Sequence, residues 1–240
     1  MSSGIYVATA GAVAQSNALD ATANNIANAS TTGFHGDRVT FREALTAARS
    51  PDVATVGAGT TRVDAQAGAL LPTENPLDLA LDGDGYFGVA TPTGPRYTRA
   101  GNFQLDPKGN LGNLVTADGF AVRGQGGAPI NVPPDAKQIA VAADGTVSAD
   151  GNEIGKLELV RFAANQVKRE GGSLFSATGR PLAGELPKIR SGMLESSNVN
   201  VVRGVVDLVK VSRTYESLMR VIQGYHDIES RAARELGTPK

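Results

Sequence analysis

Residues 201–236 read VVRGVVDLVKVSRTYESLMRVIQGYHDIESRAAREL, and apolar side chains fall on one heptad frame through this stretch. Such a period predicts a single long α-helix whose apolar stripe packs against another helix. At 1.5 Å per residue, a helix of about 35 residues is about 50 Å long, which exceeds the usual globular length and favours a coiled coil or an assembly. The stripe consists of Val201, Leu208, Val211, Tyr215, Leu218, Ile222 and Tyr225.

A second helical stripe runs through the N-terminus, but its side chains are small. Residues 8–29 hold nine alanines and a single charged residue, Asp20. A helix that is small and weakly apolar on every face can pack closely on several sides, yet it buries too little apolar area to be stable alone. We therefore expect it to pair with the C-terminal helix. The stripe consists of Ile5, Ala8, Ala12, Gln15, Leu19, Thr22 and Ile26.

Between the two helical patterns, residues from about 75 to 190 alternate short apolar runs with turn residues, which is typical of β-strands. Asp-Gly pairs separate several of these runs, and we expect tight hairpin turns there because glycine adopts a positive φ without strain. The pairs are Asp82-Gly83, Asp84-Gly85, Asp118-Gly119, Asp144-Gly145 and Asp150-Gly151. Residues 46–73 show neither period and are expected to be extended.

These patterns predict an α+β fold, with an all-β domain between two long terminal helices that form a coiled-coil-like pair. The expected segments are an N-terminal helix at 1–35, an extended connector with minor β structure at 36–74, a β-rich outer domain at 75–192 and a C-terminal helix at 193–240. The two helical segments are expected to be the assembly core.

Charge and composition exclude several classes of protein. The formal net charge of −1 offers no excess positive charge for nucleic acid, and the lack of cysteine excludes disulfides and thiolate metal sites. No apolar run is long enough for a spanning helix, so no stable membrane insertion is expected. The N-terminus also lacks the basic and apolar regions of a cleavable secretory signal. The chain is therefore expected to be cytoplasmic or to be exported by a machine that needs no such signal.

Three patterns could suggest chemistry, and each has a plainer explanation. Residues 83–88 match G-x-G-x-x-G, but a dinucleotide site needs a helix to open there and residues 89–95 cannot form one, so a hairpin is expected. Counted from Asp82 or Asp144, the twelfth residue is not the glutamate of a calcium loop. His35 and His226 are both expected on the surface. We predict no catalytic residue, no cofactor and no metal site.

Four blocks of the sequence resemble bacterial flagellar rod and hook proteins. They are ANNIANASTTGF at Ala23–Phe34, TENPLDLALDGDGYF at Thr73–Phe87, YTRAGNF at Tyr97–Phe103 with DPKGNL at Asp106–Leu111, and LESSNVNVV at Leu194–Val202 with RTYE at Arg213–Glu216. The blocks occur in the family's order and span nearly the whole chain, so the chain is identified as a member of that family.

The resemblance implies a non-enzymatic structural role in the bacterial flagellum. The terminal helices would form the inner layer of a hollow axial tube in the periplasmic rod, with the β-rich middle outside. The implied partners are further copies of the chain, other rod proteins and the flagellar type III export apparatus. The assembly interface is expected at Ile5, Ala8, Ala12, Gln15, Leu19, Asn24, Asn25, Ile26, Asn28, Gly33, Phe34, Val201, Leu208, Val211, Tyr215, Leu218, Ile222 and Tyr225.

Within the family, Ile5-Tyr6-Val7-Ala8 and the modest length most resemble the proximal rod type. A distal rod or hook-type subunit is the alternative. A surface-binding β module with helical oligomerisation ends is a further alternative from another functional class. At the end of the first helix, Asn24, Asn25 and Asn28 could either cap backbone groups or bond across subunits.

Overall fold

The computed structural model describes residues 2–45, 54–106 and 112–236. The chain divides into two compact units, each assembled from separate segments. The first unit comprises Met1–Ala27, Asp37–Arg62 and Asn200–Lys240, and the second comprises Asn28–Gly36 and Val63–Val199. The predicted α+β class is confirmed. The division into four consecutive segments stays a prediction.

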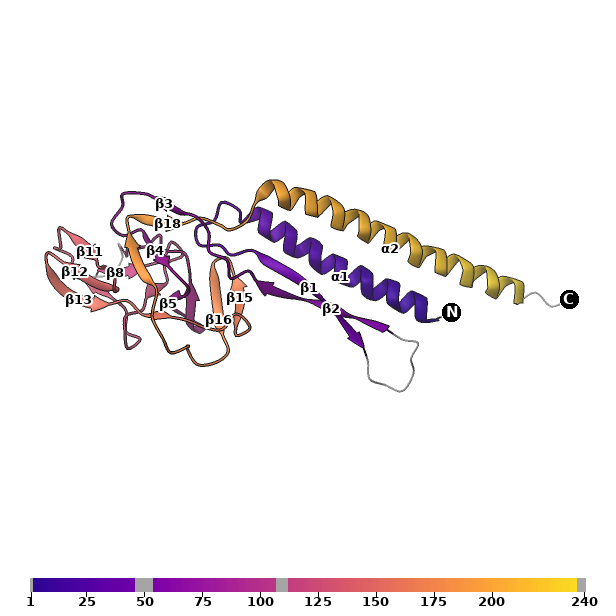
Figure 1. Cartoon of the computed structure of the whole chain (residues 1–240), viewed down its shortest axis with the longest axis horizontal. Coiled ribbons are helices and arrows are strands. Elements are labelled where there is room, and N and C mark those ends of the chain that lie inside the picture. The colour runs from indigo at the N-terminus through magenta and orange to yellow at the C-terminus, as the bar shows by residue number, and fades with distance from the viewer. Residues whose placement is uncertain (1, 46–53, 107–111, 237–240) are drawn as a thin grey trace. The chain divides into compact units, whose positions relative to one another are not determined.

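The first unit is built on two antiparallel helices, α1 (Ser2–Ala27) and α2 (Val201–Leu236), which lie side by side (Figure 1). Glycines bring them close together. Tyr225 lies over Gly4, and Ile26 lies so near Gly204 that a Cβ there would approach Ile26 Cγ1 to 2.9 Å. Glycine inside a helix costs about 1 kcal/mol relative to alanine. The close approach that Gly204 permits offsets this cost with packing.

A β-hairpin lies along another face of α1 (Figure 1). Its strands, β1 (Asp37–Leu45) and β2 (Ala54–Val63), form a two-stranded sheet. Asn25 ties α1 to this hairpin, because its Nδ2 donates to the Asp37 carbonyl (2.8 Å) and its Oδ1 accepts from the Asp37 N–H (2.7 Å). β1 and β2 make up more β-strand than the sequence predicts for residues 36–74. Hydrogen bonds between the two strands satisfy the backbone groups whatever the period of the side chains.

The second unit contains all the other described strands, most of them short. A nine-stranded sheet follows the path β10-β8-β9-β5-β6-β16-β15, with β14 on β5 and β7 on β8. Beside it stand the meander β11-β12-β13 and the pairs β17-β4 and β18-β3. The strands are β3 (Leu70–Pro72), β4 (Leu79–Asp82), β5 (Tyr86–Thr91), β6 (Gly94–Thr98), β7 (Gln104–Leu105), β8 (Gly112–Val115), β9 (Ala121–Val122), β10 (Asn131–Val132), β11 (Ile139–Val141), β12 (Thr146–Ala149), β13 (Asn152–Lys156), β14 (Leu159–Val160), β15 (Val167–Gly171), β16 (Leu174–Ala177), β17 (Lys188–Ser191) and β18 (Met193–Glu195).

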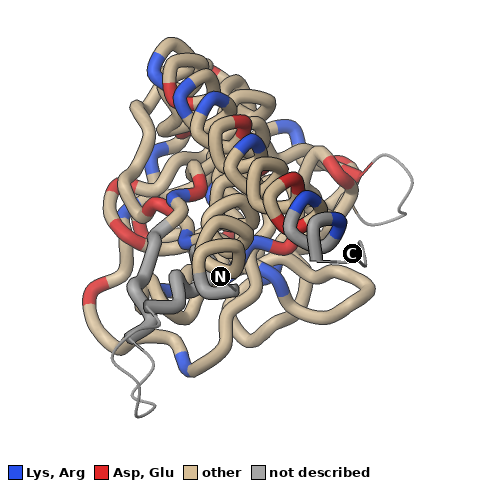
Figure 2. Tube along the Cα trace, turned by 90° about the vertical axis from the view of Figure 1, so that its right-hand side faces the viewer, with Lys and Arg blue, Asp and Glu red and all other residues tan. Residues whose placement is uncertain are grey.

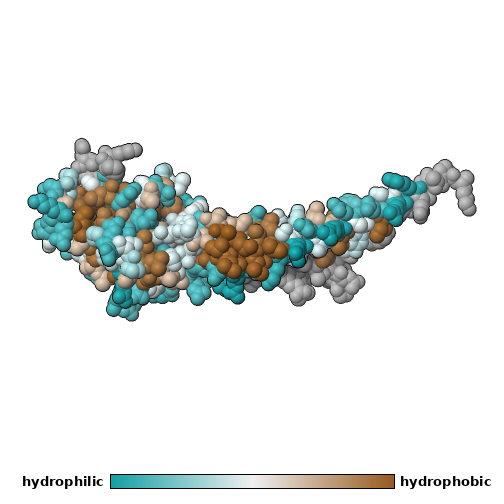
Figure 3. Space-filling view, turned by 90° about the horizontal axis from the view of Figure 1, so that it is seen from above, coloured by the Kyte–Doolittle hydropathy of each residue, from teal (hydrophilic) through white to brown (hydrophobic). Residues whose placement is uncertain are grey.

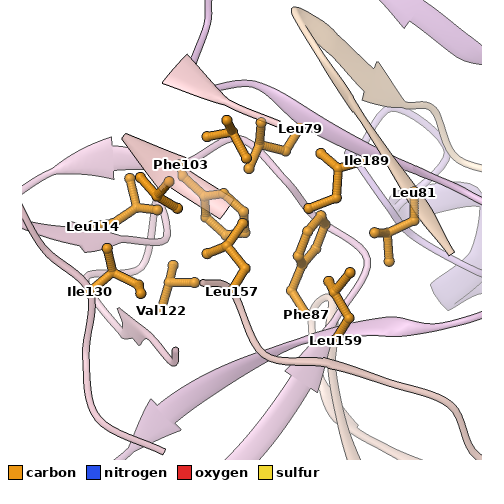
Figure 4. Packing of buried hydrophobic residues seen from close by; sticks show 12 residues of the cluster. Leu79, Leu81, Phe87, Phe103, Leu114, Val122, Ile130, Leu157, Leu159 and Ile189 are labelled. Carbon is orange, nitrogen blue, oxygen red and sulfur yellow. The ribbon is translucent and has the colours of Figure 1, made fainter. Parts of the chain in front are cut away.

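One apolar core holds these sheets together (Figure 4). Phe87 and Phe103 meet edge to face at its centre, with ring centroids 5.1 Å apart and an interplanar angle of 85°. Leu79, Leu157 and Ile189 come from separate parts of the chain and are almost fully buried beside them. Such a core accounts for the folding of many short strands that are individually too small to be stable.

The Asp-Gly turns are only partly as predicted. All five glycines have positive φ, and the pairs at 118–119, 144–145 and 150–151 close the hairpins β8–β9, β11–β12 and β12–β13. The hairpin prediction is wrong for 82–85, because these residues join β4 to β5, and β4 pairs with β17 instead. The long-range pairing of β4 therefore overrides the local turn signal.

Gly119→Ala is expected to destabilise the second unit by about 1–2 kcal/mol. A Cβ at Gly119 would meet nothing within 4 Å, so the whole cost comes from its φ of +82°. Gly224→Ala is the matched control, because its surroundings are equally open but it lies within α2 at an ordinary helical φ. That substitution should instead stabilise the helix by about 1 kcal/mol. Urea unfolding and amide hydrogen exchange measure the two effects, and equal signs would contradict the explanation.

Candidate assembly surfaces

The predicted stripe of α1 lies against α2 within the same chain. Ala8 and Ala12 are buried, and Ile5, Gln15, Leu19, Thr22 and Ile26 are half-buried. Small side chains of a second face are also buried, namely Ala14, Ala18 and Ala21. Because α1 contacts both α2 and β1, it packs on more than one side, as the sequence predicts.

The α2 stripe is only half-buried by this pairing. Leu208, Val211, Tyr215, Leu218, Ile222 and Tyr225 keep intermediate exposure, and Val201 is 48% exposed. Charged residues follow the outer side of α2, whereas α1 is almost free of charge (Figure 2). A single chain therefore leaves apolar area on its helix pair uncovered.

The most exposed apolar area of the helix pair lies at the start of α2 (Figure 3). We call it the valine patch, and it comprises Val201, Val202, Val205, Val206 and Val209, which are 46–76% exposed. Beside it, Leu19 and Ala23 of α1 and Leu208 and Val209 of α2 line a groove of about 490 Å³, with Arg213 and Glu216 at its edge. Contiguous exposed apolar area of this kind marks interaction surfaces.

The asparagines at the end of α1 differ in their surroundings. Asn24 is exposed and, with Asn17, Asp20 and Asp37, lines a polar pocket of about 260 Å³ beside the hairpin. Asn28 begins the turn after α1, where its carbonyl accepts from the Thr31 N–H (3.1 Å). The amide of Asn25 thus bonds within the chain, and that of Asn24 lies at the surface.

Gly33 and Phe34, both expected at the assembly interface, lie inside the second unit. Gly33 has a φ of +64°, and a Cβ there would lie 2.3 Å from the backbone at Arg99 and Ala100. The Phe34 ring is completely buried beneath the Arg169 guanidinium, 4.2 Å from the ring centroid. Both residues are therefore in contact with their own chain.

The surface prediction is wrong for His35, which is 1% exposed, while His226 is exposed as predicted. His35 Nε2 lies 2.8 Å from Glu195 Oε1, and Nδ1 lies 2.9 Å from the Asp64 carbonyl oxygen. Arg99 Nη1 reaches Glu195 Oε2 at 3.3 Å. We call His35, Arg99 and Glu195 the buried ionic centre. No local sequence pattern brings these three residues together, because they come from three separate blocks of the chain.

Glu195 is completely buried, yet its surroundings favour the ionised carboxylate. Burial by itself raises the pKa of this carboxyl, but the His35 hydrogen bond and the Arg99 charge outweigh it and hold the pKa below its ordinary value. The Gly68 N–H also donates to Oε1 (3.0 Å). The ion pair with Arg99 lacks good hydrogen-bond geometry, since Arg99 Nη1 and Glu195 Oε2 have no hydrogen-bond partner. His35 is therefore the principal side-chain donor to Glu195.

The ionic centre sits where residues 33–36 and 195–198 run together. The Gly33 N–H donates to the Glu195 carbonyl (2.8 Å), and the Asn198 N–H donates to the Phe34 carbonyl (3.2 Å). Asn198 Oδ1 accepts from the Gly36 N–H (2.7 Å). We call this set of contacts, together with the contacts of the His35 ring to Asp64 and Glu195, the clasp. It ties the segment that follows α1 in sequence to the segment that precedes α2.

Three family models match the chain, each over a different part. "Flagella basal body rod protein" matches residues 5–35, "Flagellar hook protein FlgE/F/G D1 domain" matches 80–149 and "Flagellar basal body rod FlgEFG protein C-terminal" matches 190–235. The flagellar basal-body rod protein FlgF of Rhizobium meliloti is 32% identical over 99% of both chains. The chain belongs to the flagellar basal-body rod protein family. FlgF of Salmonella typhimurium is 38% identical over 97% of both chains, and FlgG of Bacillus subtilis is 35% identical over 85% of this chain and 88% of its own.

As a member of this family, the rod protein is a structural subunit of the flagellar basal body. It is most like FlgF, as its first residues and length predict. Assembly with other axial proteins of the flagellum follows from the same membership. Among the described residues, neither helix is both long and apolar enough to cross a membrane.

Proposed function

We propose that this rod protein polymerises through α1 and α2 into a helical axial shaft that transmits torque from the motor to the hook. It acts there without enzymatic activity, at the proximal rod position. The valine patch carries this proposal, because its apolar area stays exposed after α1 has packed against α2 and β1. A neighbouring subunit that covers the patch would gain about 25 cal/mol for each Å² of apolar surface buried. Interlocked long helices also give a shaft the stiffness that torque requires.

The predicted interface residues on the two helices contribute to the proposed assembly in two ways, while Gly33 and Phe34 are packed inside the second unit. The stripe residues, among them Ala12 and Leu218, pair the two helices inside each subunit. Exposed and half-buried apolar positions such as Val201 and Leu208 are available for contacts between subunits. The partners are further copies of the chain and other rod proteins. The subunit reaches them through the flagellar type III export apparatus.

The double substitution Val206→Glu and Val209→Glu is expected to block rod assembly while leaving the chain folded. Both side chains are 46–50% exposed, so the isolated subunit tolerates the charges, but an interface would bury them unpaired at a cost of several kcal/mol. Motility assays and electron microscopy of basal bodies measure the effect. Leu186→Glu, at a 47% exposed leucine of the second unit, is the matched control and should preserve motility. Normal basal bodies in the double variant would refute the proposed interface.

A further inference from the structure

The two ring nitrogens of His35 both face oxygen atoms that can only accept hydrogen bonds. Nδ1 lies 2.9 Å from the Asp64 backbone carbonyl, which has no proton to give. Nε2 lies 2.8 Å from Glu195 Oε1, which also accepts from the Gly68 N–H, and the Arg99 guanidinium beside Oε2 favours the ionised, acceptor-only form of this carboxyl. A neutral imidazole has one N–H and one lone pair, so it can satisfy only one of these contacts.

The other charged groups near the ring do not change the two hydrogen-bond acceptors that face its nitrogens. Arg99 is buried beside Glu195 and keeps its charge, and its ion pair is with Oε2, not with the Oε1 that faces His35. Arg169 Nη2 donates to the backbone carbonyl of His35, not to its ring. The Asp64 carboxylate accepts from the Gln66 N–H (3.2 Å). Burial raises the pKa of Tyr86, whose ring lies 5.7 Å from the Arg99 guanidinium, so it stays a neutral phenol. Asp84, the other carboxylate acting on Tyr86, is exposed.

We propose that His35 is held as the imidazolium in the folded rod protein and that its second proton closes the clasp. The cation donates to both oxygens at once and so joins three segments, at residues 35, 64 and 195. When the proton leaves, one oxygen faces a nitrogen lone pair at 2.8–2.9 Å in a site closed to water. That contact is repulsive, and an unsatisfied buried acceptor is costly. The contacts of the clasp therefore depend on this proton, and they stabilise the second unit more below neutral pH than in alkaline solution.

The sign of the pH effect follows from proton linkage. A histidine in an unfolded chain is mostly neutral above about pH 6.5. If the folded ring keeps its second proton there, folding takes up a proton, and the free energy of unfolding falls as the pH rises. One linked proton changes the folding equilibrium constant by up to about tenfold per pH unit. This inference rests on the clasp alone and is independent of the proposed axial function.

Two measurements on the full chain test the proposal. Long-range ¹H–¹⁵N correlation spectra at pH 7.5 should show both ring nitrogens of His35 protonated, and His226→Gln identifies the signals of the other histidine. His35→Gln assigns the signal. In urea unfolding between pH 6 and 9, followed by tyrosine fluorescence, the wild type and His226→Gln should lose stability steadily as the pH rises, while His35→Gln should give a flatter profile.

Each outcome decides the matter. A neutral His35 tautomer at pH 7.5 would overturn the proposal, and so would equal pH slopes in the wild type and His35→Gln. If His35→Gln fails to fold, the spectrum of the wild-type protein still distinguishes imidazolium from neutral imidazole. Normal rods built by a His35→Gln subunit would leave the axial function untouched, because the clasp and the valine patch are separate features.

Discussion

Cells whose only rod subunit of this type carries Leu218→Asp are expected to be non-motile and to have no complete rod, although the second unit of the variant folds normally. Leu218 lies against Gly11 of α1, where a Cβ would be 3.4 Å from Leu218 Cδ1. An aspartate there loses the apolar contact and places a carboxylate between the helices without a partner. The combined cost is about 3–5 kcal/mol, enough to separate α2 from α1. Soft-agar motility and electron microscopy of basal bodies measure the outcome.

Its control is the neighbouring substitution Ser217→Asp, which adds the same charge at an exposed position of the same helix. This variant should assemble. Hydrogen exchange in residues 79–98 should match the wild type in both variants, because these strands belong to the second unit. A motile Leu218→Asp strain with normal basal bodies would show that pairing of α1 with α2 is unnecessary for assembly.

Glu195→Gln should destabilise the second unit by about 3–5 kcal/mol, the usual cost of removing one partner from a buried ion pair. The amide keeps the shape and one acceptor oxygen, but it leaves the Arg99 guanidinium, 2% exposed, without its counter-charge and replaces the second oxygen by an NH2 group that cannot accept. Urea unfolding followed by tyrosine fluorescence measures the change. Asp82→Asn, which removes an exposed pair with Arg190, is the matched control and should cost less than about 1 kcal/mol.

The same substitution should change the response to acid. The folded pKa of Glu195 lies below its ordinary value of 4.5, so its ionised form stabilises the protein fully above that pH. The contribution is lost as the pH falls through the folded pKa, because protonation then removes the bonds to His35 and Arg99. Glu195→Gln should therefore show a weaker loss of stability below pH 4.5 than the wild type. An unchanged acid profile would mean that Glu195 is not the responsible carboxyl.

Periodicity in the sequence predicts the helix pair well, because the heptad stripes are local and only their partner has to be found. Leu208, Leu218 and Tyr225 therefore appear on the expected face of α2. Val201, the first residue of α2, is instead 48% exposed and belongs to the valine patch. The heptad period does not show that the valines at the start of α2 form an exposed patch; only the structure does.

The buried ionic centre could not be predicted in this way. His35, Arg99 and Glu195 lie in three blocks separated by 64 and 96 residues, and no period connects them. A histidine is on average more often exposed than buried, and the burial of this one depends on partners that tertiary folding supplies. The prediction of a hairpin between β4 and β5 was wrong for the same reason, since β17, a strand far along the chain, pairs with β4.

The antiparallel pairing of α1 with α2 also bears on the order in which the parts of the chain fold. Gly4 and Tyr225 are neighbours in space but are about 220 residues apart along the chain. The second unit contains about two thirds of the intervening residues, and most of its strands pair with strands nearer in sequence, which form faster. We therefore expect the helix pair to form last, with one face of α1 uncovered until residues 201–236 are present. A chain interrupted before that point lacks α2 and cannot form the helix pair, so we expect only whole chains to present the paired surface.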